Sequence, residues 1–266
     1  EALRQPDVEA ACGHMAYYHT LVGMVARQVD GNHQLACDAY QRALDIEPNR
    51  HDTLYNLANL IKDDRPEEAD IMYRRSLQIN PFSASTWHNL GSNLNTLNRY
   101  LDSVAPLKVS LQIDPSNPEV WCNLGLAYYG AEDFVRAERS FRHTIGLDSS
   151  HSPGYQNLGN TLISVLRPEE AIEILEKGRA LDSSSTHSLW NLSLAYLLLG
   201  QYKVGWRYYE ARFNCPDFES VEPPTSGDAL QDISKAPKPG QEPLVVWTEQ
   251  GIGDVIQFCR YLYLLK

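Results

Sequence analysis

Five asparagines recur at an almost constant spacing through the middle of the chain. Successive members lie 33, 34, 34 and 34 residues apart, and they are Asn56, Asn89, Asn123, Asn157 and Asn191. An asparagine amide offers both a hydrogen-bond donor and an acceptor, so a row of them can pair with the backbone of an extended peptide whatever its side chains are. The structural alternative is that each amide bonds a neighbouring helix. We call these five residues the asparagine row.

Further polar side chains without a permanent positive charge accompany the row: Gln156, Asn160, Ser92 and His88. A lysine-rich groove, which would bind a C-terminal carboxylate, is missing from this part of the sequence, so an adaptor for chaperone tails is disfavoured. We therefore predict that a protein or an extended peptide binds along the row, with Gln156 and Asn160 contributing to the contacts.

A second candidate is the stretch EQGIGD at positions 249–254. Gly251 and Gly253 would expose backbone N–H groups at the positive end of a following helix, which is a natural place for an anion. A dinucleotide fingerprint would need a third glycine where Ile256 stands, and the Gly-Lys-Ser/Thr of a P-loop is absent. The alternative is a tight turn in which Asp254 caps the helix.

Metal and cofactor sites are not predicted in this chain. His14 and His19 are five residues apart, which puts them on different faces of a helix. The cysteines are odd in number and never occur as C-x-x-C, which indicates reduced thiols in the cytoplasm rather than disulfides or zinc ligands. They are Cys12, Cys37, Cys122, Cys215 and Cys259.

The charge and hydropathy of the chain disfavour two classes of partner. The formal net charge is -11, from 34 acidic and 23 basic residues, and no run of lysine or arginine occurs. Nucleic-acid binding needs clustered cations, so we expect none. No apolar run reaches the length of a membrane span, and the segment that starts at Glu1 lacks the features of a signal peptide. We expect a cytoplasmic protein without membrane contact.

The asparagine row is carried by an internal repeat. Trp121, Leu124, Gly125 and Tyr128 fall at i, i+3, i+4 and i+7, one stripe of an amphipathic helix, and a second such helix follows. The same slots recur 34 residues earlier and later. A 34-residue period with W-x2-L-G-x2-Y…A-x3-F…P is the signature of the tetratricopeptide repeat (TPR). Clear copies cover 50–82, 84–116, 118–150, 152–184 and 186–213.

An earlier copy at 17–47 is worn. It keeps Gly23 and Tyr40, but its first helix is off register by about one residue. Because each repeat buries its apolar stripe only against its neighbours, the predicted fold is an all-α solenoid. We expect a right-handed superhelix of five to six repeats over residues 1–213.

The composition changes after this array. Residues 214–242 are rich in proline and predict a linker. Residues 243–266 predict a strand at Leu244–Trp247, the glycine-rich turn, and an apolar helix at Val255–Leu265. This strand-turn-helix stub is the usual beginning of an α/β domain and is too short to fold unaided.

Two motifs give this C-terminal part a resemblance to a known family. They are GQYxxGWxxYExR at 200–212 and EQGIGDVIQFxRY at 249–261. Together they resemble bacterial TPR proteins whose C-terminal half is a glycosyltransferase of the GT-B fold, similar to heptosyltransferases. The resemblance implies that Asp254 is the general base toward an acceptor hydroxyl, although Gln257 stands where those enzymes often have histidine. It also implies that a nucleotide sugar would bind in a full-length parent, in a second lobe beyond this chain.

The asparagine row similarly resembles the TPR groove of O-GlcNAc transferase, which guides peptides to a GT-B catalytic half. The leading hypothesis is therefore the recognition region of a TPR-containing glycosyltransferase, which binds protein but is not catalytic as this fragment. One alternative is a stand-alone interaction scaffold whose last helix caps the solenoid. Another is an assembly subunit that self-associates through the apolar C-terminal helix.

Overall fold

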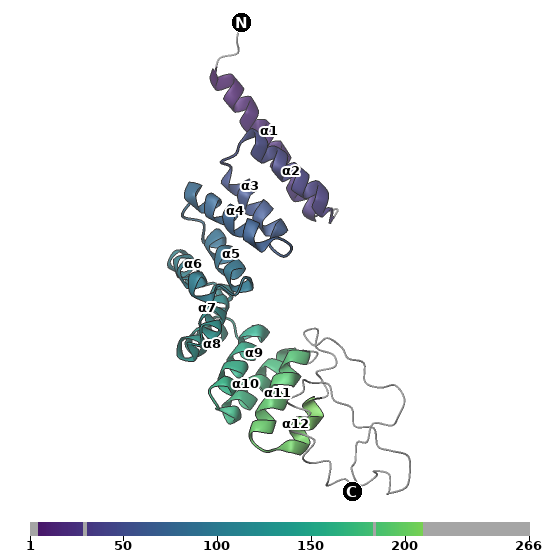
Figure 1. Ribbon diagram of the computed structural model, residues 1–266, viewed down its shortest axis with the longest axis vertical. Coiled ribbons are helices and arrows are strands. Elements are labelled where there is room, and N and C mark those ends of the chain that lie inside the picture. The colour runs from purple at the N-terminus through teal and green to yellow at the C-terminus, as the bar shows by residue number, and fades with distance from the viewer. Residues whose placement is uncertain (1–4, 29–30, 183–184, 210–266) are drawn as a thin grey trace, which may run out of the picture. The chain divides into compact units, whose positions relative to one another are not determined.

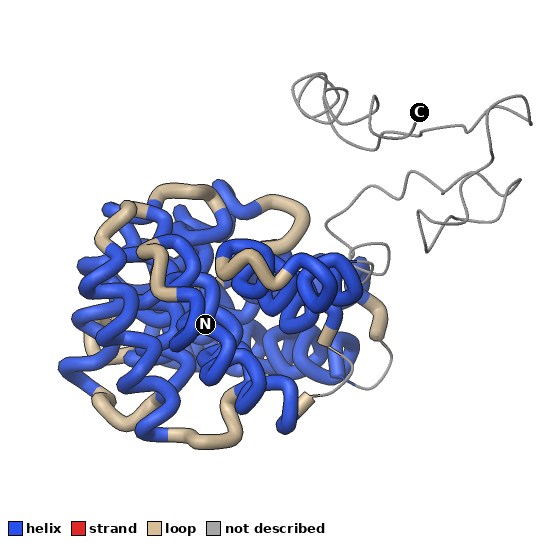
Figure 2. Tube along the Cα trace, turned by 90° about the horizontal axis from the view of Figure 1, so that it is seen from below, coloured by secondary structure: helices blue, strands red, loops and turns tan. Residues whose placement is uncertain are grey.

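A computed structural model describes residues 5–28, 31–182 and 185–209, with side chains described from residue 12 onward. Within these ranges all regular structure is helical (Figure 2). The helices are α1 (Gln5–Gln28), α2 (His33–Ile46), α3 (His51–Ile61), α4 (Pro66–Ile79), α5 (Ala84–Thr96), α6 (Tyr100–Ile113), α7 (Pro118–Gly130), α8 (Phe134–Leu147), α9 (Ser152–Ser164), α10 (Pro168–Leu181), α11 (Thr186–Leu198) and α12 (Tyr202–Tyr209). The predicted linker at 214–242 and the predicted strand-turn-helix stub at 243–266 lie outside the described residues.

The helices follow one another in pairs along the chain (Figure 1). Each helix contacts its partner in the pair, and each even helix from α2 to α10 also contacts the first helix of the next pair. The odd-numbered helices also contact one another, α5 with α7, α7 with α9, and α9 with α11. The predicted all-α solenoid is confirmed, and its five clear repeats coincide with the pairs from α3/α4 to α11/α12. The worn copy forms the α1/α2 pair.

A glycine in the odd helix allows the two helices of a pair to pack closely. A Cβ placed on Gly125 would lie 2.5 Å from the ring of the fully buried Phe141, so no larger residue fits without movement. In the worn copy, Gly23 lies in the same way against Tyr40, at 2.5 Å. The register shift of the worn copy is explained by one extra residue between Gly23 and Tyr40, compared with the spacing of Gly125 and Phe141. The same pairing recurs as Gly91–Leu107 and Gly159–Leu175.

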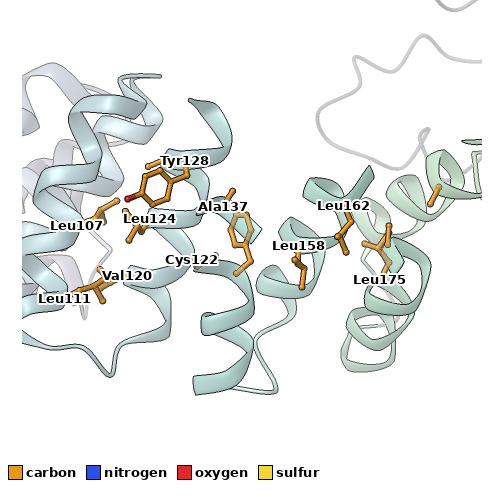
Figure 3. Packing of buried hydrophobic residues seen from close by; sticks show 14 of the residues in the cluster. Leu107, Leu111, Val120, Cys122, Leu124, Tyr128, Ala137, Leu158, Leu162 and Leu175 are labelled. Carbon is orange, nitrogen blue, oxygen red and sulfur yellow. The ribbon is translucent and has the colours of Figure 1, made fainter. Parts of the chain in front are cut away.

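The buried apolar residues form two clusters in the described chain, one from α1 to α5 and one from α6 to α11, and each cluster spans successive pairs. Figure 3 shows Leu107 of α6 beside Leu124 and Tyr128 of α7, and Leu111 of α6 beside Val120 of α7, in a cluster that continues through α9 and α10. Each odd helix is therefore covered by the even helix before it and the even helix after it. This arrangement buries the stripe that the sequence pattern predicted.

The signature aromatic residues fix the turn between repeats. Trp121 donates its indole N–H to the carbonyl of Pro115 at 3.0 Å, six residues earlier. Trp87 donates to Pro81 in the same way at 2.8 Å. In the next repeat the Tyr155 hydroxyl takes this role. Because these rings are only half-buried, the position that they occupy in each repeat contributes to the loop as well as to the core.

A comparison of two glycines tests the close helix packing. We expect Gly125→Ala to lower the unfolding midpoint in urea, with a cost of about 1–3 kcal/mol, because the new methyl group collides with Phe141. Gly146→Ala is the matched control: Gly146 also lies in a helix, and a Cβ there meets nothing within 4 Å. That variant should gain roughly 1 kcal/mol from helix propensity alone. Equal gains in both variants would contradict the packing argument.

Candidate functional site

The odd helices differ from the even helices in charge. We define the odd-helix face as the accessible side of α3, α5, α7, α9 and α11. These five helices contain no lysine or arginine, and their acidic residues are Asp52 and Glu119. Glu119 is well exposed, with 61% of its side chain accessible, and its carboxylate contacts His151 at 3.0 Å. A ligand on this face therefore meets polar uncharged groups and a weak negative charge.

All five members of the asparagine row are half-buried on these helices. Asn89 donates its amide N–H groups to the Tyr55 hydroxyl at 3.2 Å and to Asn59 Oδ1 at 2.7 Å. Asn59 Oδ1 also accepts a hydrogen bond from the hydroxyl of the buried Tyr73, at 2.7 Å. This network joins two consecutive repeats through side chains alone.

Two further members of the row bond the preceding repeat. The Asn123 amide nitrogen lies 2.7 Å from His88 Nε2, and the Asn157 amide nitrogen lies 3.5 Å from Cys122 Sγ. The structural alternative for the row therefore accounts for the donors of three asparagines.

The carbonyl oxygens of the row have a different environment. Within the described residues, the Oδ1 atoms of Asn89, Asn123 and Asn157 accept no hydrogen bond, and the side chains of Asn56 and Asn191 make none. Three asparagines of the row thus use their amide donors to join repeats, and the carbonyl oxygens of these three have no hydrogen-bond donor among the described residues. Peptide binding by the row remains a prediction.

The two other predicted residues lie on α9. Gln156 donates to the Ser185 hydroxyl at 2.9 Å and so links α9 to the start of α11. The side chain of Asn160 makes no hydrogen bond among the described residues, and it is half-buried. Both residues therefore lie on the same helix as Asn157, and the amide of Gln156 is already engaged. Asp254, Gly251 and Gly253 lie outside the described residues.

Sequence reasoning missed several residues of the same face. Asn95 donates its amide to the backbone carbonyl of Asn123 at 2.9 Å. The Tyr129 hydroxyl lies 3.0 Å from the Ser164 hydroxyl of the next repeat. Asn95 and Tyr129 occupy the same position of the repeat, six residues after Asn89 and Asn123 respectively. Alignment of the repeats with one another could therefore have identified this position.

Burial shifts the pKa values of two titratable side chains that contact the asparagine row. Desolvation lowers the pKa of His88 below its ordinary value of 6.5, and Glu119 opposes this shift. Desolvation also raises the pKa of the Cys122 thiol to about 11, against the hydrogen bond from Asn157. A neutral thiol is a poor nucleophile, so Cys122 acts as a small buried side chain. No group of three or more histidine, cysteine or acidic residues in the described ranges could hold a metal ion.

None of the described helices combines the length and the apolar character that a membrane crossing needs.

The lowered pKa of His88 predicts a pH dependence of stability. Because the unfolded chain protonates this imidazole at higher pH than the folded chain, the free energy of unfolding should fall as pH falls through 6.5. We expect the urea midpoint to fall less in His88→Gln than in the unchanged chain, since glutamine keeps an acceptor for Asn123 and does not titrate. Identical pH profiles would contradict the neutral role of His88.

The chain was compared with known proteins. No protein-family model matches the chain, and no curated protein matches it. PilW, a type IV pilus biogenesis factor, has a similar structure, with a TM-score of 0.68, 20% identity, and coverage of 77% of this chain and 96% of PilW.

Two further solved structures are similar. PilF of Pseudomonas aeruginosa gives a TM-score of 0.64 at 19% identity, with coverage of 77% of this chain and 93% of PilF. YrrB, described as a TPR protein with an unusual peptide-binding site, gives 0.54 at 16%, with coverage of 67% and 93%. At these identities the likeness establishes the fold alone. The described helices form a TPR solenoid.

Proposed function

We propose that this chain is a protein-interaction scaffold whose odd-helix face binds an extended peptide segment of a partner. The observation that carries the proposal is the hydrogen bonding of the asparagine row. The amide donors of Asn89, Asn123 and Asn157 are used between repeats, and their carbonyl oxygens accept no hydrogen bond from the described residues, so these oxygens remain for a ligand. YrrB, which shares the fold, is described as having a peptide-binding site, and this supports the proposal as an analogy of fold.

The chemistry of the face defines the class of peptide. Carbonyl acceptors pair with backbone N–H groups and with donor side chains such as lysine, arginine, serine and threonine. The odd helices carry Asp52 and Glu119 and no cation, so an acidic peptide would be repelled. We therefore expect neutral or basic segments, bound in an extended conformation, to be preferred over acidic ones.

Two asparagines provide a test that does not disturb the fold. Asn56 and Asn191 make no side-chain hydrogen bond within the described residues, so their replacement by alanine should leave stability unchanged. We expect Asn56→Ala with Asn191→Ala to weaken capture of neutral and basic peptides from an immobilised library by about fivefold or more.

The matched control is Gln78→Ala, which removes an exposed amide from the even helix α4. This variant should bind peptides as the unchanged chain does. Binding that survives in the double variant, or that is lost equally in the control, would rule out the odd-helix face as the binding surface.

A second candidate is the finer hypothesis that this scaffold is the recognition region of a glycosyltransferase. It rests on the resemblance of positions 249–261 to the first turn of GT-B enzymes, with Asp254 as the base. The stand-alone scaffold explains the described helices equally well and requires no catalytic half.

Sugar chemistry separates the two candidates. Under the glycosyltransferase hypothesis the sugar donor binds in a second lobe, so we expect no hydrolysis or transfer when nucleotide sugars are added to this chain. Product release from a nucleotide sugar, followed by chromatography, would refute the assignment of this chain as a recognition region alone. Asp254→Asn is the control that would identify the responsible base.

A further inference from the structure

An arginine at the start of an even helix connects neighbouring repeats at two junctions. Arg99 contacts Asp102 in its own helix at 2.8 Å and Asp70 in the preceding even helix at 3.8 Å. Two repeats later, Arg167 contacts Glu170 of its own helix and Glu138 of the preceding even helix. The arginine is surrounded by acids in both cases, so these junctions neutralise their own charge.

The junction between α6 and α8 has the opposite charges in the same slots. Asp133 stands where the arginine would be, and Arg136 stands where Asp102 and Glu170 stand. Val104 replaces the acid of the preceding even helix. Arg136 pairs only with Asp133, at 3.0 Å, and no ion pair joins α6 to α8 within the described residues.

Two further cations at this junction have no acidic partner. Lys108 occupies the slot of Arg142, which pairs at 2.9 Å with the acid four residues earlier. The residue four before Lys108 is Val104, so no such pair forms. Arg139 is also exposed and forms no ion pair with any described residue. Lys108, Arg136 and Arg139 therefore form a local positive cluster in a chain of net charge -11.

These cations line a hollow of about 390 Å³ that is formed by residues of α6, α7 and α8. Trp121 and Tyr128 supply its aromatic wall, and Gln112 adds an amide. The Tyr128 ring lies 6.0 Å from the Lys108 ammonium and 5.6 Å from the Arg136 guanidinium. A volume of this size admits a few side chains, not a folded domain.

The next junction, between α8 and α10, has acidic side chains at two of the positions that are cationic between α6 and α8. There Arg142 holds the slot of Lys108, and Glu170 holds the slot of Arg136, and the two side chains contact each other at 3.6 Å. Glu173 holds the slot of Arg139. Carboxylates thus occupy the place that is cationic between α6 and α8.

From this contrast we infer that the hollow binds an acidic peptide segment of a partner protein. Its carboxylates pair with Lys108 and Arg139, and an adjacent apolar side chain packs against Trp121. Charge complementarity decides the occupant, because the hollow carries three cations with Asp133 as their counter-charge. The site is distinct from the odd-helix face, which disfavours acidic ligands.

The test uses the full chain and a fluorescein-labelled peptide of alternating glutamate and phenylalanine, followed by fluorescence anisotropy. We expect binding that weakens with salt, and a Kd raised about tenfold or more by Arg139→Glu or by Lys108→Glu. Arg42→Glu is the matched control, since Arg42 is an exposed arginine of the even helix α2 without an ion pair in the described part of the chain. It imposes the same change of net charge and should leave the Kd within about twofold.

Three results would overturn the inference. The first is equal binding of a peptide with glutamine in place of glutamate. The second is displacement of the peptide by inorganic phosphate at constant ionic strength, which would indicate a phosphate site. The third is a salt-sensitive dimer in light scattering that Arg139→Glu abolishes while the peptide does not bind, which would make a second copy the occupant. Circular dichroism of Arg139→Gln, measured beside the charge reversal, separates lost binding from lost folding.

Discussion

No helix pair of this chain can bury its apolar stripe alone, and this constraint explains the rest of the structure. Leu107 and Leu111 on one pair need Leu124 and Tyr128 on the next, and that pair in turn covers the one that follows. In several pairs a glycine such as Gly125 allows a close approach to a large buried side chain of the partner helix. Because packing uses the apolar stripe, polar residues such as the asparagine row lie beside it and not within it.

Much of the fold was predictable from the sequence because the repeat period reports packing directly. The slots of Gly125 and Phe141 recur every 34 residues, and they fix which helices pair. The structure was needed to explain the register of the worn first copy. One extra residue separates Gly23 from Tyr40, so the sequence spacing differs from that of the other repeats although the same contact forms. Residues 243–266, including Asp254, lie outside the described residues, so their predicted strand-turn-helix stub stays a prediction.

The candidate site was predictable in position but not in orientation. The spacing of the asparagine row places it on the odd helices, and that is where all five residues lie. Which end of each amide forms a hydrogen bond depends on partners in the preceding repeat, such as His88 for Asn123 and Cys122 for Asn157. Those partners differ in type from repeat to repeat. The net charge of the chain likewise could not predict the reversed charges around Arg136, because a single sum over all residues contains no information about where the charges lie.

Helix α7 belongs to both faces at once. Asn123 points to the odd-helix side, where it meets α5, and Trp121 lines the hollow between α6 and α8. A helix with its side chains is only about 10 Å across. Segments bound on the two sides would therefore sit back to back, and a partner carrying both would gain avidity from the high local concentration of the second segment. A single helix of this solenoid is thereby sufficient to bring two unlike sequences together.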